Sequence, residues 1–212
     1  MTDAFDLDWE GLRRVPQQTR SRERLLQVLA AAERILVNEG APMLTTTRVA
    51  QEAGVSVASL YQYLPDRDAI IETLADTYLR RLENRMRKLL RSAGQRTWSD
   101  PVGILFDAFV DAYRAEDGFR ALWFSRSLTD ATQAADREHK RRMAQMLREI
   151  LMQQGIAETP RLDVVARSAH LVADTMLQEA FRADPEGDDA LIEEAKTILR
   201  GYLREYLATA EF

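Results

Sequence analysis

Apolar residues recur at helical spacing along almost the whole chain of 212 residues, and no run alternates as a half-buried strand would. The first apolar stripe consists of Leu25, Val28, Leu29, Ala32 and Leu36. Residues three or four positions apart lie on one face of a helix, so this stripe can pack against a core. The pattern predicts an all-α protein with about nine helices joined by short loops.

Capping residues, glycines and prolines predict where the helices begin and end, because Ser, Thr and Asp accept the first free N–H groups and proline cannot continue a helix. For the first four helices we expect a stop at Gly40, a short helix capped at Thr45 or Thr46 and ending near Gly54, another from Ser56 to Pro65, and a long one from Asp66 to about Gly94. Later starts are expected at Asp100-Pro101, at Thr159-Pro160 and after Asp184-Pro185, with stops at Gly118, at Gly155 and near Ala208.

The change from short to longer helices predicts three parts in the chain. Residues 1–18 form an N-terminal extension, which is disordered in the simplest reading. Its arginines could instead form an arm on DNA, or Trp9 and Leu12 could pack on the body. Residues 19–66 form a small three-helix domain, and residues 67–212 form a larger helical body. We expect the boundary to fall at or inside the helix that begins near Arg67.

Several classes of function are disfavoured by what the chain lacks. There is no cysteine, which excludes disulfides, zinc–thiolate sites and cysteine nucleophiles. The two histidines, His139 and His170, are too few for a His-rich metal site. The sequence shows no nucleophile–base pair, glycine-rich phosphate loop or metal-ligand spacing. No apolar run approaches the ~18 residues that cross a bilayer, and the acidic N-terminus is not a secretory signal. We therefore expect a cytoplasmic, non-catalytic protein without a metal or cofactor.

Positive charge is concentrated in one segment of a chain whose net charge is −5. Residues 13–67 carry eight arginines against five acids, whereas the segments on both sides are acidic. This segment could meet phosphates. A solvated helical surface with chance arginines would give the same composition, so the charge needs the support of a motif.

The stretch TTTRVAQEAGVSVASLYQYLPDRDAI, residues 45–70, has the pattern of a helix-turn-helix. Its first helix can turn Val49, Ala50 and Ala53 inward, and Gly54 stands where a left-handed turn residue is needed. On the second helix the predicted inward residues are Val57, Leu60 and Leu64. This leaves, on the outside or at the edges, Ala58, Ser59, Tyr61, Gln62 and Tyr63.

The outward residues suit contact with double-stranded operator DNA. Gln62 can read adenine, Ser59 can reach bases or phosphate, and the hydroxyls of Tyr61 and Tyr63 suit phosphate oxygens. In the alternative interpretation, both tyrosines pack in a helical core and Gly54 belongs to an ordinary loop.

From Arg22 to Ile71 the chain resembles the TetR (tetracycline-repressor-like) family of transcriptional regulators. The resemblance implies a phosphate contact for Thr46 and contacts to bases or backbone for Thr47 and Arg48. It further implies that Arg67 holds a phosphate at the start of the fourth helix. The recognition-helix pattern is matched by Ser56, Ser59, Leu60, Tyr61 and Tyr63.

Three positions depart from the commonest family pattern and leave the operator sequence open. Val57 stands where a polar residue is frequent, and could contact a thymine methyl or be buried. Leu64 replaces the usual Phe, and Arg67 replaces the usual Lys, which keeps the charge but changes its geometry.

The last two predicted helices are apolar on more than one side, so both sides need to be buried. One side can face the chain's own core and the other a two-fold partner, although burial inside a monomer is the alternative. The resemblance favours a homodimer. The residues expected in its interface are Val165, Val172, Ile198, Tyr202 and Tyr206.

Aromatic and methionine residues concentrate in the middle of the body, where they could line a cavity for a hydrophobic or aromatic ligand or simply fill a core. The resemblance favours an effector cavity there, and His170 could be its polar group. The expected lining residues are Phe106, Phe109, Tyr113, Trp123, Phe124, Met143, Met146, His170 and Met176. The predicted function is thus a repressor that a small hydrophobic or aromatic effector releases from its operator. A DNA-binding regulator controlled by a protein partner is the alternative.

Overall fold

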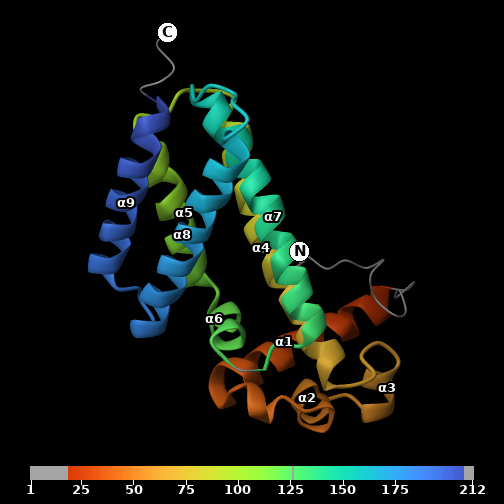
Figure 1. The fold of residues 1–212 in the computed structure, drawn as a ribbon. Coiled ribbons are helices and arrows are strands. Elements are labelled where there is room, and N and C mark those ends of the chain that lie inside the picture. Colours follow the sequence, from red (N-terminus) through yellow and green to blue (C-terminus); the bar gives the residue numbers. More distant parts are fainter. Residues whose placement is uncertain (1–18, 126, 208–212) are drawn as a thin grey trace. The chain divides into compact units, whose positions relative to one another are not determined.

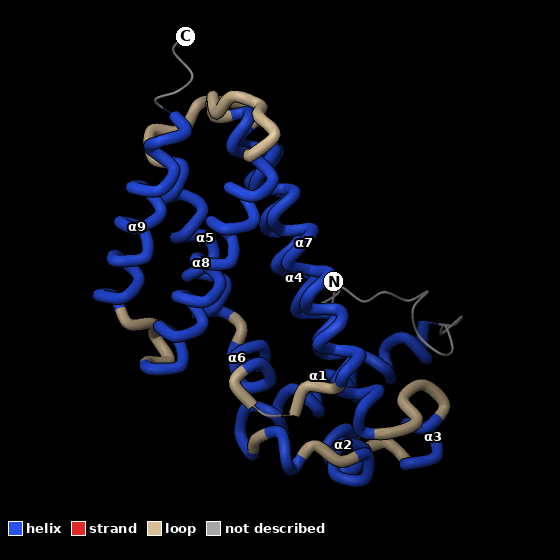
Figure 2. Tube along the Cα trace, viewed as in Figure 1, coloured by secondary structure: helices blue, strands red, loops and turns tan. Residues whose placement is uncertain are grey.

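The computed structural model describes residues 19–125 and 127–207, and within these ranges it contains helices and loops but no strand (Figures 1 and 2). The predicted all-α fold with nine α-helices is confirmed for the described residues, with one additional 3-10 helix. In chain order the elements are α1 (Thr19–Glu39), η1 (Ala41–Met43), α2 (Thr46–Ala53), α3 (Val57–Tyr61), α4 (Arg67–Ala93), α5 (Pro101–Ala115), α6 (Asp117–Trp123), α7 (Asp130–Gln153), α8 (Leu162–Ala183) and α9 (Asp189–Leu207). The predicted extension, residues 1–18, lies outside the described residues.

The chain divides into two compact units. Unit 1 contains the chain up to Arg81 together with Glu116–Asp136, and unit 2 contains Leu82–Ala115 and the chain from Arg137 onward. The division falls inside α4, the helix that begins at Arg67. The first turns of α4 belong to unit 1 because they bury apolar side chains such as Ile70 and Leu74 completely. The domain boundary read from the sequence stays a prediction.

Unit 1 is built around α1, whose buried face includes Leu25, Leu29 and Ile35. Helices α2 and α6 both pack on α1. The hydroxyl of Tyr78 on α4 donates to Glu33 on α1 at 2.8 Å. A Cβ added to Gly118 would collide with that hydroxyl, so Gly118 allows α6 to approach α4 closely. The predicted stop at Gly118 is therefore wrong: α5 ends at Ala115, and this glycine lies in the first turn of α6.

The other predicted glycine stops agree with the structure. Gly40, Gly54 and Gly155 each follow the end of an α-helix with φ values of 86°, 66° and 95°. The recognition helix is shorter than predicted, because α3 ends at Tyr61 and a turn precedes Pro65. Helix α8 starts at Leu162 rather than directly at the Thr159-Pro160 pair.

In unit 2, α8 packs against α9, and α5 contacts both helices, as Figure 1 also shows. The rings of Tyr113 on α5 and Phe181 on α8 lie 5.1 Å apart. Gln154, after α7, donates to the backbone of Ala93 and Arg96 at 3.0 and 3.1 Å and accepts from the N–H of Trp98 at 2.6 Å. One buried amide thereby fixes the loop between α4 and α5. None of the described helices combines the length and the apolar character needed to cross a membrane.

Candidate DNA-binding surface and body cavity

Local capping sets the geometry at the start of α2. The Thr45 side chain accepts a hydrogen bond from the Arg48 N–H at 3.2 Å, so Thr45 is the N-cap and Thr46 begins the helix. The Thr46 hydroxyl lies 3.3 Å from that of Tyr61, at the end of α3. Two hydroxyls expected to meet phosphate are thus side by side, although they are 15 positions apart in the sequence.

The short helix α3 has the inward and outward faces that its sequence predicts. Ser56 caps it by accepting from the Ser59 N–H at 3.1 Å. Leu60 and Leu64 are both 1% exposed. The outward residues differ in exposure: Ala58, Tyr61 and Gln62 are exposed, whereas Ser59 and Tyr63 are half-buried. Val57 is half-buried as well, so neither of its two predicted roles is excluded by burial.

Arg48, which the sequence assigns to DNA contact, is bound to two carboxylates. Its guanidinium lies 2.5 Å from Glu39 and 3.3 Å from Glu52. Hydrogen bonding of the guanidinium to the Glu39 carboxylate is the main reason that the pKa of Arg48 is raised, and burial opposes it. Glu52 also pairs with Arg34 at 3.1 Å. Arg48 must exchange these partners for a phosphate or base if it contacts DNA, whereas its neighbour Thr47 is exposed.

Arg67 is held at the start of α4, near where the resemblance expects a phosphate. It donates to the backbone carbonyl of Ala41 at 3.1 Å, and Asp66 caps the helix by accepting from the Ala69 N–H at 2.8 Å. The structure adds Arg24, which donates to the Ser59 hydroxyl at 3.2 Å. The sequence analysis missed Arg24, since the only signal for it was the basic character of residues 13–67.

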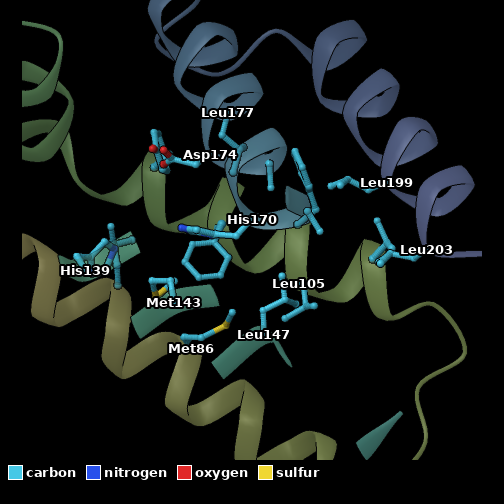
Figure 3. Close-up of a pocket in the computed structure, with 17 residues that line it drawn as sticks. Met86, Leu105, His139, Met143, Leu147, His170, Asp174, Leu177, Leu199 and Leu203 are labelled. Carbon is cyan, nitrogen blue, oxygen red and sulfur yellow. The ribbon is translucent and has the colours of Figure 1, made fainter. Parts of the chain in front are cut away.

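Unit 2 contains a cavity of about 80 Å³, which we call the body cavity (Figure 3). Side chains from α4, α5, α7, α8 and α9 line it. Five of the nine predicted residues are among them: Phe106, Phe109, Tyr113, Met143 and His170. Their role toward a ligand stays a prediction.

The other four predicted residues do not line the body cavity. Trp123 belongs to unit 1, where its ring stacks on Phe119 at 4.5 Å, and Phe124 follows it at the end of α6. Met146 and Met176 are half-buried on α7 and α8 but lie outside the lining. Aromatic and methionine content was therefore too coarse a signal to separate the cavity wall from the rest of the core.

Two polar lining residues, His139 and Asp174, escaped the sequence analysis. His139 is 5% exposed, and its Nδ1 lies 3.0 Å from Oε1 of Glu83, a carboxylate that is 4% exposed. Burial opposes the charge on Glu83, but hydrogen bonds from His139 and Arg142 outweigh it and lower the pKa of Glu83 to about 2. No local pattern indicates that His139 is buried, because the segment around it has the composition of a solvated helix face.

Comparison with known proteins gives matches in both parts of the chain. A model of the tetracyclin repressor-like C-terminal domain matches residues 97–203, half of the chain, and a model of bacterial regulatory proteins of the tetR family matches residues 28–74. The chain belongs to the TetR family. It is a DNA-binding transcriptional regulator, which confirms the family and the class of function predicted from its motif.

Individual relatives of this TetR-family regulator match it to different extents. Nucleoid occlusion factor SlmA of Aliivibrio fischeri is 33% identical over 75 residues, so the chain matches little more than a third (37%) of that relative's length. A TetR-family transcriptional regulator from Streptomyces coelicolor is 29% identical, with a TM-score of 0.59 over 87% of this chain and 99% of that one. The SmeT–triclosan complex is 16% identical with a TM-score of 0.60 over 89% and 92% of the two chains, a likeness of fold alone.

The outer face of α8 and α9 in this TetR-family chain carries large apolar side chains. Val172 and Ile198, both expected in a dimer interface, are 36% and 44% exposed. Tyr202 and Tyr206 are half-buried, with ring centroids 5.5 Å apart. Val165 is only 2% exposed, so it packs inside its own unit. Its predicted position in the interface is wrong. Two further α8 residues are exposed, Val164 and Leu171.

Proposed function

We propose that this TetR-family chain is a homodimeric repressor that binds operator DNA through α2 and α3, and that a small apolar effector in the body cavity releases it. The observation that carries the effector proposal is a cavity lined by side chains from five helices. The fold neighbour SmeT, in complex with triclosan, supports small-molecule control of such a fold. As a DNA-binding regulator the protein would act in the cytoplasm, without catalysis.

On the DNA-binding surface we assign backbone contacts to hydroxyl and guanidinium groups. Thr46 and Tyr61 would donate hydrogen bonds to the same phosphate, because their hydroxyls lie 3.3 Å apart. Tyr63 and Arg67 would hold further phosphates. Gln62, which is exposed directly after α3, is the residue we assign to a base edge.

We assign the dimer interface to the outer face of α8 and α9. Four of the large exposed apolar side chains of the described chain lie there: Val164, Leu171, Val172 and Ile198. Several large exposed apolar side chains on two neighbouring helices are typical of a surface that a partner covers. A second copy of the chain, related by two-fold symmetry, would cover it and form a four-helix interface.

Release from DNA would be a shift between two states of the regulator. Helix α4 carries Arg67 at its start and contributes Leu82 and Met86 to the cavity wall. An effector that prefers one arrangement of these wall residues would change the population of α4 conformers, and hence the presentation of Arg67. A coupling of ~1–3 kcal/mol changes operator affinity several-fold to over a hundredfold.

The proposal is tested by isolating genomic DNA bound to the full-length protein and measuring affinity for the recovered site. Affinity should fall steeply as salt rises, because phosphate contacts release counterions. Sedimentation should show a dimer at micromolar concentration. A flat salt response would contradict the assigned phosphate contacts, and a monomer would contradict the assigned interface.

A second candidate is a DNA-binding regulator controlled by a protein partner. It is favoured by the size of the cavity, since about 80 Å³ is small beside the ~300–1,000 Å³ that drug-sized ligands occupy. The match to SlmA, which covers only part of each chain, adds weak support. Retention of operator binding in the presence of every small aromatic probe, together with release by a protein, would favour this candidate.

A further inference from the structure

The body cavity has a polar end and an apolar end. Figure 3 shows His139 and Asp174 on one side of the cavity, Leu199 and Leu203 on the other, and His170 between them. The polar residues come from α7 and α8, and the two leucines come from α9. An occupant therefore meets an imidazole and a carboxylate at one end and two leucines at the other.

His139 is held so that it offers an acceptor. Its Nδ1 faces the Glu83 carboxylate at 3.0 Å, and a carboxylate can only accept a hydrogen bond. In a neutral imidazole the proton therefore sits on Nδ1, and Nε2 carries a lone pair. Among the described residues, Glu83 is the hydrogen-bond partner of this ring. Glu83 is thus a positioning residue that fixes His139 as an acceptor on the cavity wall.

Asp174 offers a second acceptor. Its Oδ2 accepts from Gln178 at 3.0 Å and lies 3.0 Å from the ammonium of Lys140. The described residues provide no hydrogen bond to Oδ1. The polar end thus combines an imidazole nitrogen and a carboxylate oxygen, each of which can accept a hydrogen bond from a ligand.

The charges around this end are already balanced by the protein. Glu83 pairs with Arg87 at 3.0 Å and with Arg142 at 2.8 Å, and Asp174 pairs with Lys140. A cationic ligand would find no carboxylate that lacks a counter-ion, and burying its charge would cost free energy. An anionic ligand would face the lone pair of His139 and the carboxylate of Asp174 at this end. A neutral group with an O–H or N–H suits both acceptors.

We propose that the body cavity selects a neutral ligand of one aromatic ring with a hydroxyl group, which donates to His139 Nε2 or Asp174 Oδ1 while the ring lies toward Leu199 and Leu203. The cavity volume of about 80 Å³ holds roughly five to eight waters, which matches the seven heavy atoms of phenol. The inference rests on the proposed function, because it names the class of effector that this site takes.

The test is calorimetric titration of the full-length protein at pH 8 with phenol and toluene, which have the same shape but differ in the donor. Benzylamine and benzoate are titrated as the cationic and anionic members of the series. We expect phenol to bind most tightly. Loss of one buried hydrogen bond changes affinity about tenfold, so the toluene-to-phenol ratio of Kd values should fall about tenfold in whichever of His139→Phe and Asp174→Leu removes the acceptor of the phenol hydroxyl, and stay unchanged in the other. An unchanged ratio in both variants would overturn the inference.

Met143→Leu is the matched control, since it alters the apolar wall without removing an acceptor. It should shift the affinities of phenol and toluene together and leave their ratio unchanged. Circular dichroism checks that each variant is folded, and the wild-type ratio tests the inference if either polar variant fails to fold. Equal binding of phenol and toluene, or tightest binding of benzylamine or benzoate, would overturn the hydroxyl inference but leave the cavity as an effector site. If none of the four probes binds, both the effector part of the proposed function and this inference are refuted.

Discussion

The buried Glu83 carboxylate should make the stability of the protein depend on pH in acid. Its pKa is lowered from 4.5 to about 2 in the folded chain. The unfolded chain therefore takes up this proton at higher pH than the folded chain does. The stabilisation is complete above about pH 5 and is lost as the pH falls toward 2. A shift of this size corresponds to about 3 kcal/mol in total, of which about 1.4 kcal/mol is lost between pH 7 and pH 3.5.

The assay is urea denaturation at pH 7 and pH 3.5 at one fixed protein concentration, because a dimer's stability depends on concentration. Wild type should lose about 1.4 kcal/mol more than Glu83→Gln between the two pH values. Glu138→Gln is the matched control, since Glu138 also pairs with Arg142, at 3.5 Å, but its side chain is 46% exposed. The reasoning is refuted if wild type and Glu83→Gln lose the same free energy of unfolding, or if Glu138→Gln removes as much of the pH dependence as Glu83→Gln does.

Three further substitutions test the assigned surfaces. Tyr61→Phe removes the hydroxyl beside Thr46, so it should weaken binding to all DNA sequences several-fold in fluorescence anisotropy. Gln62→Ala should instead change the preference among sequences. A Tyr61→Phe effect at one base pair only would contradict the phosphate role. Ile198→Glu should shift sedimentation from dimer to monomer, because it places a charge on an exposed apolar face, and an unchanged dimer would move the interface elsewhere. Gly54→Ala should lower the free energy of unfolding by about 1 kcal/mol, because φ is 66° there and an L side chain is strained at that angle. No atom lies near an added Cβ, so a clash adds nothing to this cost. An unchanged urea midpoint would contradict the prediction.

Features that depend on local chemistry were predictable from the sequence. Gly40 and Gly54 take positive φ values at helix ends, as stop glycines do, and Ser56 caps α3 with its own side chain. The inward positions of Leu60 and Leu64 follow from helical spacing alone. Each of these features is decided within a few residues of chain.

Features that depend on tertiary packing were not predictable. Gly118 looks like a helix stop, but its small size is needed by the Tyr78 hydroxyl from α4, 40 positions earlier. Val165 looks like an interface residue because α8 is apolar on two sides, and only packing decides which side is buried. The bond between His139 and Glu83 joins residues 56 positions apart, so nothing near His139 reveals its buried partner.

The size of the body cavity limits how tightly an effector can bind without a change in the protein. A volume of about 80 Å³ corresponds to roughly five to eight non-hydrogen atoms. Nanomolar affinity requires about 12 kcal/mol, and eight atoms reach it only at the ceiling of about 1.5 kcal/mol per atom.

An effector with nanomolar Kd must therefore enlarge the cavity, and unbranched side chains such as Met86 and Met143 are the wall residues most able to move. Crystal structures of the protein with and without such an effector would measure the change. An unchanged cavity volume with nanomolar binding would refute the argument. Expansion by movement of Met86 would couple effector binding to the position of α4, the helix that also carries Arg67.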